Sequence, residues 1–287
     1  MEHKYFNSII STHKGRKGSV RAFLRSIYLA SKLIDKNTFE IIIADLDTDK
    51  EIDLIINSYK DILNVTHCKI NYDGLFWKSK ALNHCASKTQ GKYITMIDID
   101  AIVPTRFFQN INEFYNDMAN ERSKLCYRVR FLDPKTSQVA MKTNFNEDFV
   151  NNLIVQHRKF RQAFERYTKD EVKLRGDMNA PQKKWLHGQA LGNSHYTMLK
   201  EDFMEIGGYD EKFIGWACED LDFNKRAFEY LGQGTLIGSP SWTVFSVHHN
   251  RTGWMSRKGT IRNERLYHSN KKNHIVKIPI GEQWGKF

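Results

Sequence analysis

The sequence predicts an α/β fold built on a mostly parallel sheet with helices on both faces. In the first hundred residues, short apolar runs alternate with amphipathic segments, and the connections between them are short. This alternation is typical of doubly wound sheets. With 287 residues, of which 40% are hydrophobic and 27% charged, the chain is long enough for a globular domain with a substantial core.

The first predicted strand and helix are separated by a glycine-containing loop. FNSIIS (6–11) is apolar and β-prone, which favours a strand, and HKGRKGS (13–19) is a loop with two glycines. Over residues 20–34 apolar side chains recur near helical spacing, which predicts a helix. FEIIIAD (39–45) is a continuous apolar run, as expected for a strand buried on both faces.

The same alternation continues to residue 98. KEIDLIINSYKDIL (50–63) favours a helix, and NVTHCKI (64–70) favours a third strand. WKSKALNHCASKT (77–89) predicts a helix that closes near Gly91. KYITMID (92–98) is the fourth predicted strand.

Three acidic residues lie at the ends of these strands. Asp45 ends the second strand, and Asp98 and Asp100 end the fourth. Because ligands of parallel sheets bind beyond the carboxyl ends of the strands, we expect these side chains to converge on one crevice. Carboxylates at positions i and i+2 of a strand share a face, and a divalent cation between them would offset their repulsion. An acidic loop without a metal is the alternative.

Neither of the common glycine-rich phosphate-binding motifs is present. The first loop is not GxGxxG, and the chain has no GxxxxGK[ST]. A phosphate ligand would therefore be held by a cation and by basic side chains.

The second half of the chain is less regular. Residues 175–194 are rich in Gly, Asn and Pro, which predicts a long loop of the kind that serves as a lid or a binding loop. Residues 149–167 predict a helix with one apolar face, which is more typical of a core than of a cofactor site. That face carries Phe149, Leu153, His157, Phe160, Phe164 and Tyr167.

Two further segments carry residues suited to chemistry. GWACEDLD (215–222) places Glu219, Asp220 and Asp222 at a predicted helix start, where capping could explain them and where one open carboxylate could act as a general base. A β-prone run at 241–254 ends in His248 and His249, and imidazole suits ions such as manganese. Neighbours on a strand point to opposite faces, so at most one of the two histidines is expected to bind a metal.

Composition excludes several classes of protein. No apolar stretch approaches the roughly 18 to 20 residues of a membrane span, and the N-terminus lacks the layout of a signal peptide. We therefore expect a cytoplasmic protein. The four cysteines form no CxxC pair, which predicts reduced thiols rather than a zinc site or a disulfide framework.

The net charge is +11 and is unevenly distributed. Residues 251–287 hold nine Lys or Arg against two Glu. Such patches attract phosphorylated substrates, nucleic acid or anionic lipid, so we expect an anionic partner or peripheral contact with the inner membrane face. A surface that only keeps the protein soluble is the alternative.

The order of these motifs carries a resemblance. It resembles the nucleotide-sugar glycosyltransferases of the GT-A fold, in particular the β-1,4-galactosyltransferase and chondroitin-polymerase type. The FNRAKLLN segment of that type resembles FWKSKALN (76–83), and its DVD resembles DID (98–100). Its WGGEDDD resembles WACEDLD (216–222), and its metal-binding RHSR resembles HHNR (248–251). The resemblance spans roughly residues 5 to 255, and DxD alone would be a weak signal.

The resemblance implies a single GT-A domain over residues 1–287. Residues 1–104 would bind the nucleotide sugar, residues 105–250 would bind the acceptor and carry catalysis, and residues 251–287 form a basic segment. The implied activity is a UDP-sugar-dependent hexosyltransferase of polysaccharide biosynthesis, with Mn²⁺ or Mg²⁺ as the cation and a glycan or glycoconjugate as the acceptor.

The resemblance also implies roles for individual residues. Asp220 would be the base of an inverting transfer, and Glu219 would hold the acceptor or exchange roles with it. The implied donor-binding residues are Asp45, Phe76, Lys78, Lys80, Asp98, Asp100 and Trp216. The implied metal ligands are Asp98 and Asp100, with His249 favoured over His248.

Three departures from the pattern bear on these roles. Ala217 and Cys218 replace two glycines that approach the acceptor, and Ser246 stands where the animal enzymes have a Met ligand. Lys78 replaces an Arg, which keeps the charge but loses the bidentate fork.

Two alternatives from other classes stay open. One is a retaining transferase of the polypeptide N-acetylgalactosaminyltransferase type, which also resembles the acidic helix. The other, more distant, is a non-enzymatic basic nucleic-acid-binding protein, although the chain lacks a recognition helix or an aromatic RNA-binding signature.

Overall fold

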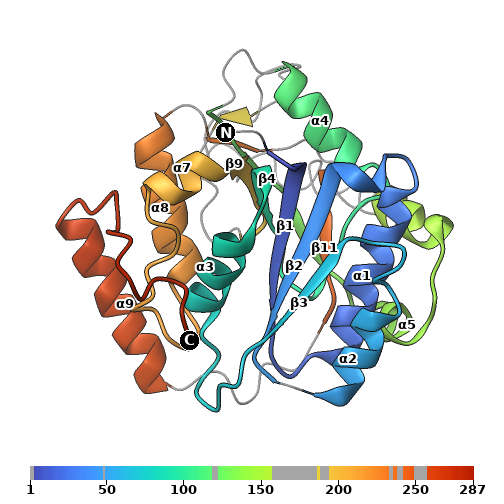
Figure 1. Cartoon of the computed structure of the whole chain (residues 1–287), viewed down its shortest axis with the longest axis horizontal. Helices are drawn as coiled ribbons and strands as arrows, with labels where there is room; N and C mark the ends of the chain where they lie inside the picture. Colours follow the sequence, from blue (N-terminus) through green and yellow to red (C-terminus); the bar gives the residue numbers. More distant parts are fainter. Residues whose placement is uncertain are drawn as a thin grey trace, which may run out of the picture.

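The computed structural model describes residues 3–47, 49–117, 122–156, 186–187, 194–232, 235–237, 242–248 and 257–287. Its centre is an eight-stranded sheet in the order β3-β2-β1-β4-β9-β6-β10-β8, with helices packed on both faces (Figure 1). The predicted α/β fold with a mostly parallel sheet is confirmed.

The first half of the sheet follows the alternation read from the sequence. Strands β1, β2, β3 and β4 are mutually parallel, and His13 at the end of β1 lies in register with Asp45 at the end of β2. The elements in chain order are β1 (Tyr5–His13), α1 (Lys17–Ser31), η1 (Lys36–Thr38), β2 (Phe39–Asp45), α2 (Lys50–Asn57), β3 (Val65–Lys69), α3 (Lys78–Lys88) and β4 (Gly91–Met96).

Several of these elements end earlier than predicted, and two of the differences bear on the structure near the strand ends. Helix α2 stops at Asn57 instead of residue 63, and the backbone N–H groups that follow bond within short turns. Strand β4 stops at Met96, so Asp98 and Asp100 lie in the turn beyond the strand rather than on it. The Ala101 N–H donates to the Asp98 carbonyl at 3.0 Å, which fixes that turn.

The second half of the sheet breaks the parallel pattern. Strand β9 (Tyr196–Leu199) is antiparallel to both β4 and β6 (Lys124–Cys126). Strand β10 (Thr235–Ile237) is parallel to β6 and antiparallel to β8 (Leu186–His187). Strand β8 falls within the segment predicted to be a loop, and that prediction is wrong for these two residues.

A second, smaller sheet, five more labelled helices and a helical stretch at residues 147–156 complete the described structure. The small sheet has the order β5-β11-β7, formed by Ala101–Ile102, Val244–Ser246 and Val129–Phe131. The helices are α4 (Phe107–Asp117), α5 (Pro134–Lys142), α7 (Lys200–Glu205), α8 (Glu219–Leu231) and α9 (Arg257–Lys272).

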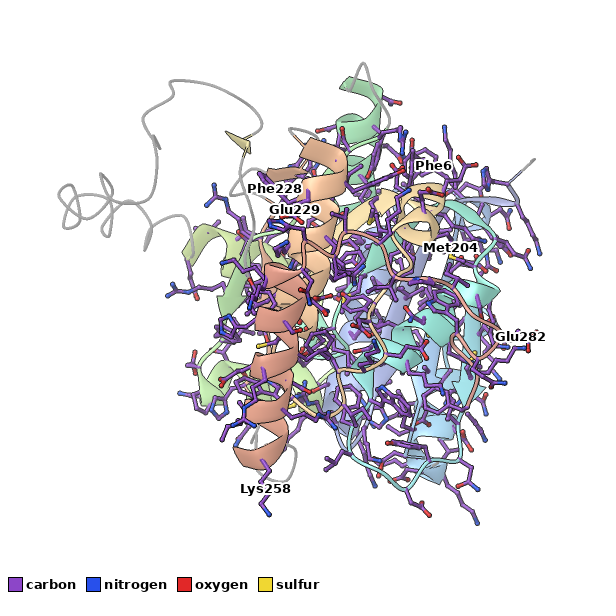
Figure 2. All side chains as sticks on the ribbon, turned by 90° about the vertical axis from the view of Figure 1, so that its left-hand side faces the viewer. Phe6, Met204, Phe228, Glu229, Lys258 and Glu282 are labelled. Atoms are coloured by element: carbon purple, nitrogen blue, oxygen red, sulfur yellow. The ribbon has the colours of Figure 1, made fainter. Side chains whose placement is uncertain are left out.

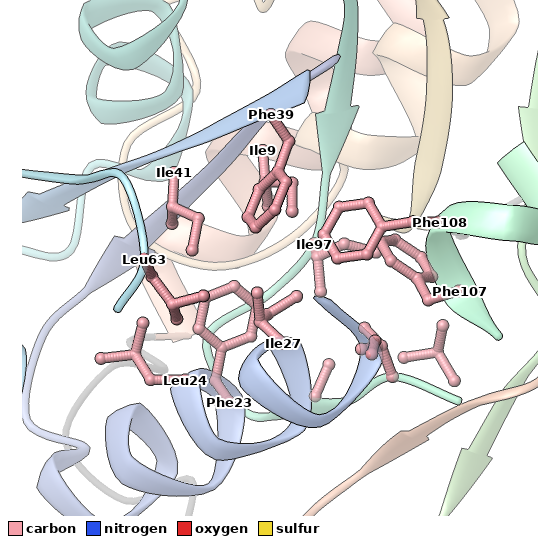
Figure 3. Packing of buried hydrophobic residues seen from close by; sticks show 14 of the residues in the cluster. Ile9, Phe23, Leu24, Ile27, Phe39, Ile41, Leu63, Ile97, Phe107 and Phe108 are labelled. Carbon is pink, nitrogen blue, oxygen red and sulfur yellow. The ribbon is translucent and has the colours of Figure 1, made fainter. Parts of the chain in front are cut away.

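Each face of the large sheet has its own apolar core. On one face, Ile9 and Phe39 of the strands pack with Phe23 and Ile27 of α1 and with Phe107 of α4 (Figure 3). All five side chains are fully buried, and each such burial contributes about 1.5–3 kcal/mol. The opposite face packs against α3, α7 and α8. The sheet is thereby a rigid support for the loops at its edge.

A third cluster tests the apolar stripe predicted for residues 149–167. Leu153 is buried and Phe149 packs against the same cluster, so the core assignment is confirmed for these two. The other four members of the stripe lie outside the described residues.

The cysteines agree with the prediction of reduced thiols. Cys68, Cys85 and Cys126 are buried, Cys218 is partly exposed, and none is in a disulfide. Among the described helices, none has the length and hydrophobicity needed to cross a membrane.

Candidate active site

A cavity of about 540 Å³ opens beyond the ends of β1 and β4. Charged and aromatic side chains from both halves of the chain face it. Its lining residues are Arg16, Phe76, Lys78, Asp98, Asp100, Val129, Phe131, Ser194, His195, Gly215, Trp216, Ala217, Cys218, Glu219, Asp220, Leu221, Ser246 and Glu264.

Lys78 is the central cation of this cavity. Its Nζ lies 2.9 Å from Asp98 Oδ1 and 2.9 Å from Asp220 Oδ2, and its side chain is 8% exposed. Burial alone would lower the pKa of Lys78, but the charges of Asp220 and Asp98 raise it above its ordinary value. Lys78 therefore stays charged and joins the turn after β4 to the start of α8.

The N-terminal part of α3 is fixed against the loop that precedes α8. Trp77 Nε1 donates to the Glu211 carbonyl at 2.8 Å, and Ser79 Oγ donates to the Phe213 carbonyl at 3.1 Å. Asn83 makes a reciprocal pair with the backbone of Tyr209, with both distances at 2.9 Å. These contacts flank Lys78 on both sides and place it opposite Asp220.

Asp98 has both carboxylate oxygens engaged. Oδ1 accepts from Lys78, and Oδ2 accepts from the Ser194 hydroxyl, which also contacts His195 Nδ1 at 3.0 Å. Burial would raise the pKa of Asp98, but the positive charge of Lys78 lowers it below its ordinary range. Asp98 is therefore an anion, and each of its oxygens already accepts one hydrogen bond.

Asp220 and Glu219 are the first two residues of α8. Asp220 accepts from Lys78 through Oδ2 and from the Tyr209 hydroxyl through Oδ1 at 3.3 Å, and its side chain is 17% exposed. Burial raises the pKa of Asp220, and the charge of Lys78 opposes that rise. Since each carboxylate oxygen can accept two hydrogen bonds, Asp220 keeps accepting capacity toward the cavity.

Glu219 is more deeply buried than Asp220. It is 8% exposed, and no group in the described part of the chain hydrogen-bonds its Oε2 atom. Burial, together with the negative charge of Asp220, raises the pKa of Glu219 to about 7. A buried oxygen without a partner is costly, so this atom is suited to meet a donor group of a ligand.

Asp222, the third acid of the helix start, has a structural role. It forms an ion pair with Arg226 at 2.7 Å, and both side chains are almost fully buried. Arg226 also donates to the Ile206 and Gly208 carbonyls, and Asn270 of α9 donates to Asp222 Oδ1. Asp222 thus anchors α8 and does not line the cavity.

Asp100 pairs with a cation from the first loop. Arg16 Nη1 lies 2.7 Å from Asp100 Oδ2. The Arg16 backbone N–H donates to His13 Nε2 at 2.9 Å, and His13 Nδ1 lies 3.0 Å from Asp45 Oδ1. The second oxygen of Asp45 meets His67 Nε2 at 3.0 Å.

The structure brings most of the predicted site residues together. Seven of them line the one cavity: Phe76, Lys78, Asp98, Asp100, Trp216, Glu219 and Asp220. Trp216 is 40% exposed, so its ring is accessible to a ligand.

Other predicted residues lie elsewhere or outside the described chain. Asp45 is fully buried behind the first loop, with its oxygens bonded to two histidines, and does not line the cavity. Lys80 lies over the Trp77 ring at 4.6 Å. His248 is exposed and follows β11 without lining the cavity, and His249 lies outside the described residues.

Sequence reasoning missed several cavity residues. Arg16 lies in the loop after the first strand, a position where the strand-end rule that selected the acids could have found it. Ser194 and His195 stand just before β9, which was not predicted, and Glu264 lies on the unpredicted helix α9. Ser194 ends the segment predicted to be a lid or binding loop, but no local pattern marks His195 or Glu264.

The cavity fits a divalent cation in part. Its lining includes the carboxyl groups of Asp98, Asp100, Glu219, Asp220 and Glu264, and oxygen donors are the ligands of Mg²⁺ and Mn²⁺. Among the described residues, no group of three or more His, Cys, Asp and Glu side chains is arranged to hold a metal. Asp98 is paired with Lys78 and Asp100 with Arg16, so a divalent cation at either carboxylate would meet a positive side chain that is already there.

We expect the raised pKa of Glu219 to appear as a pH dependence of stability. A carboxyl whose pKa rises from its unfolded value of 4.5 to about 7 on folding loses stabilisation as pH rises through that interval. Glu219→Gln keeps the side chain neutral. The free energy of unfolding of the Glu219→Gln variant minus that of the wild type should therefore be larger at pH 8 than at pH 5, by about 2–3 kcal/mol. Urea unfolding of both proteins at the two pH values measures this, and an equal difference at both would show that Glu219 does not titrate here.

Solved structures of two glycosyltransferases resemble the chain in fold. The structure of TarS from S. aureus matches with a TM-score of 0.62 at 11% identity, over 93% of this chain and 40% of that one. TarS residues 1–349 with UDP-GlcNAc match with a TM-score of 0.61 at 11% identity, over 94% and 70% of the two chains. GalNAc-T7 with UDP, GalNAc and Mn²⁺ matches with a TM-score of 0.56 at 12% identity, over 99% and 53%. The chain thus spans about 40% of the length of the longer TarS structure.

Sequence comparison supplies the family. No curated protein sequence matches the chain. The family model described as "Glycosyltransferase like family 2" matches residues 21–233. The narrower resemblance to the β-1,4-galactosyltransferase and chondroitin-polymerase type stays a prediction. Because the family model covers well over half of the chain, and the cavity lies in a fold shared with solved glycosyltransferases, the protein belongs to glycosyltransferase-like family 2 and has the GT-A fold.

Proposed function

We propose that the protein transfers a hexose from a UDP-sugar to a hydroxyl of a glycan or glycoconjugate, with inversion at the anomeric carbon. One observation carries this proposal. In a single cavity, Lys78 holds Asp98 on one side and Asp220 on the other. This arrangement supports a donor site and a proton-accepting group within reach of each other.

On the donor side, the proposed contacts come mainly from residues 1–104. Phe76 offers an aromatic surface, and Lys78 and Arg16 offer positive charge to a diphosphate. TarS has been solved with UDP and with UDP-GlcNAc, and GalNAc-T7 with UDP, GalNAc and Mn²⁺. These complexes support a uridine nucleotide and a divalent cation as the expected ligands. A cation held by Asp100 would act as a Lewis acid that neutralises the charge developing on the departing diphosphate.

On the acceptor side, the proposed contacts come from residues 105–250 and from α9. Trp216 offers a plate for a sugar ring, and the buried Glu219 oxygen offers a hydrogen bond to a hydroxyl of the acceptor. Asn263 of α9 donates to the Ile214 and Trp216 carbonyls at 3.2 Å, which fixes the loop that carries Trp216. The acceptor would therefore meet a preorganised surface.

Asp220 would take the acceptor proton. The acceptor oxygen bonds to the anomeric carbon, its proton passes to the Asp220 carboxylate, and the bond from that carbon to the phosphate oxygen breaks with its electron pair leaving on UDP. Lys78 opposes the rise in the pKa of Asp220 that burial causes, and it orients the carboxylate. General-base help of this kind is worth about 10²–10⁴-fold.

A donor screen tests the proposal. We expect release of UDP, and of no other nucleoside diphosphate, when the protein is given a panel of nucleotide sugars with Mn²⁺ and a mixture of glycan acceptors. Calorimetry should detect UDP binding without an acceptor. Release from a purine or cytidine sugar nucleotide instead, with no UDP binding, would contradict the uridine assignment.

Asp220→Asn tests the base. Asn keeps the shape of the side chain but cannot accept the proton, so turnover at saturating donor should fall by roughly 10²-fold or more while UDP binding is kept. Glu219→Gln is the matched variant and should reduce turnover less. If Glu219→Gln is inactive and Asp220→Asn is not, the two roles are exchanged; if both stay active, neither residue is the base.

A retaining transfer on the same fold is the second candidate, because GalNAc-T7 shares the fold over 99% of this chain. The anomeric configuration of the product separates the two. An α-linked product from an α-linked UDP-sugar would favour retention and would remove the need for Asp220 as a base.

We also propose that the basic C-terminal segment meets an anionic acceptor or the anionic inner membrane face. Lys258, Arg265, Lys271 and Lys272 of α9 are exposed, and Figure 2 shows Lys258 at the end of the helix pointing away from the protein. Each such charge near an anionic surface contributes about 1 kcal/mol and is screened by salt. The protein should sediment with anionic but not neutral vesicles at low salt, and a Lys271→Gln, Lys272→Gln variant should sediment less. Absence of binding to anionic vesicles would remove the membrane form of this proposal.

A further inference from the structure

Arg16 is paired with Asp100, one of the carboxylates of the cavity that a metal could use. The Arg16 and Asp100 side chains are 16% and 6% exposed, and their ion pair of 2.7 Å lines the cavity. Both partners are thus largely shielded from water. An ion pair is stronger in such a place than at the surface. An incoming cation cannot use Asp100 without bringing a second positive charge close to the guanidinium.

The backbone of Arg16 is held independently of this ion pair. Its N–H bonds to His13, whose ring is fully buried and bonded to Asp45, and the Gly15 N–H donates to Asp47 Oδ2 at 2.6 Å. The Arg16 carbonyl accepts from the Ser19 and Val20 N–H groups at the start of α1. The position of the loop therefore does not depend on the contact between the Arg16 side chain and Asp100.

Asp98 is also paired with a cation, and that cation has a second partner. Lys78 and Ser194 bond the two oxygens of Asp98, and Lys78 is also the partner of Asp220. Withdrawing Lys78 for a metal would leave a cluster of buried acids uncompensated. Replacing Arg16 at Asp100 by a divalent cation costs less free energy than replacing Lys78, because the guanidinium can then pair with a diphosphate that enters with the cation.

We propose that Arg16 is an exchangeable counterion of Asp100. It excludes a divalent cation that arrives alone, and it moves to the diphosphate when cation and nucleotide bind together. This inference rests on the proposed UDP site and adds an order to it: the metal enters with the nucleotide and not before it.

The test is Mn²⁺ binding, read from the electron paramagnetic resonance of unbound Mn²⁺, first without nucleotide and then with saturating UDP. Arg16→Ala should bind Mn²⁺ alone at least about 10-fold more tightly than the wild type, and should bind Mn²⁺ with UDP about 10-fold more weakly. Changes of opposite sign distinguish an exchanging counterion from a residue that only supports the fold.

Three variants serve as controls. Lys17→Ala removes one positive charge at the next residue, whose side chain is paired with Asp49 and Glu51 outside the cavity. It should change neither the affinity for Mn²⁺ alone nor the affinity for Mn²⁺ with UDP. Arg16→Lys keeps a cation and should stay near the wild type for Mn²⁺ alone. Adding Asp100→Asn to Arg16→Ala should abolish the gain.

The outcomes separate this inference from the proposed function. If Arg16→Ala is folded by circular dichroism and binds Mn²⁺ alone no more tightly than the wild type, the counterion exchange is wrong and the metal-dependent transfer can stand. If no variant binds Mn²⁺ with or without UDP, both the exchange and the metal part of the proposed function are wrong.

Discussion

The buried ammonium of Lys78 is the interaction on which the site depends. Asp98 comes from the turn after a parallel strand, and Asp220 from the first turn of a helix more than a hundred residues later in the sequence. Two carboxylates in one cavity repel each other and lose hydration, so the ionised forms of Asp98 and Asp220 would be destabilised there without a cation between them. Lys78 is that cation. Its two contacts of 2.9 Å, one to Asp98 and one to Asp220, also link the two parts of the chain that these acids come from.

The surrounding structure can be understood as support for this cation. Trp77, Ser79 and Asn83 of the α3 region bond the loop at 209–213, which keeps Lys78 from turning outward. From behind that loop, the C-terminal segment packs on the preceding glycine turn: Gly207 has a φ of +81°, and a Cβ there would lie 1.8 Å from the Ile278 carbonyl oxygen. Buried polar contacts of this kind fix geometry rather than add much stability, which is what a site for group transfer needs.

How much of this could be read from the sequence depends on how local each signal was. The four parallel strands were predictable because each is a short apolar run between helical segments, and the acids at 98, 100, 219 and 220 were predictable because motif order marked them. Strand β9 was not, since its place between β4 and β6 is set by pairing across the fold. Arg16 and Asp100 are 84 residues apart, and no sequence pattern around Arg16 indicates that its side chain pairs with Asp100. Asp45 shows the limit of the strand-end rule, which gives the position of a residue but not where its side chain points.

The free energy of unfolding tests the central role of Lys78 most directly, measured by urea denaturation at pH 7 on two variants. Lys78→Met leaves Asp98 and Asp220 buried without their shared cation and should be less stable than the wild type by about 3–5 kcal/mol. The triple variant, with Asp98→Asn and Asp220→Asn added, should recover more than half of that loss, because its neutral side chains no longer need a cation. A Lys78→Met protein within about 0.5 kcal/mol of the wild type would contradict the account.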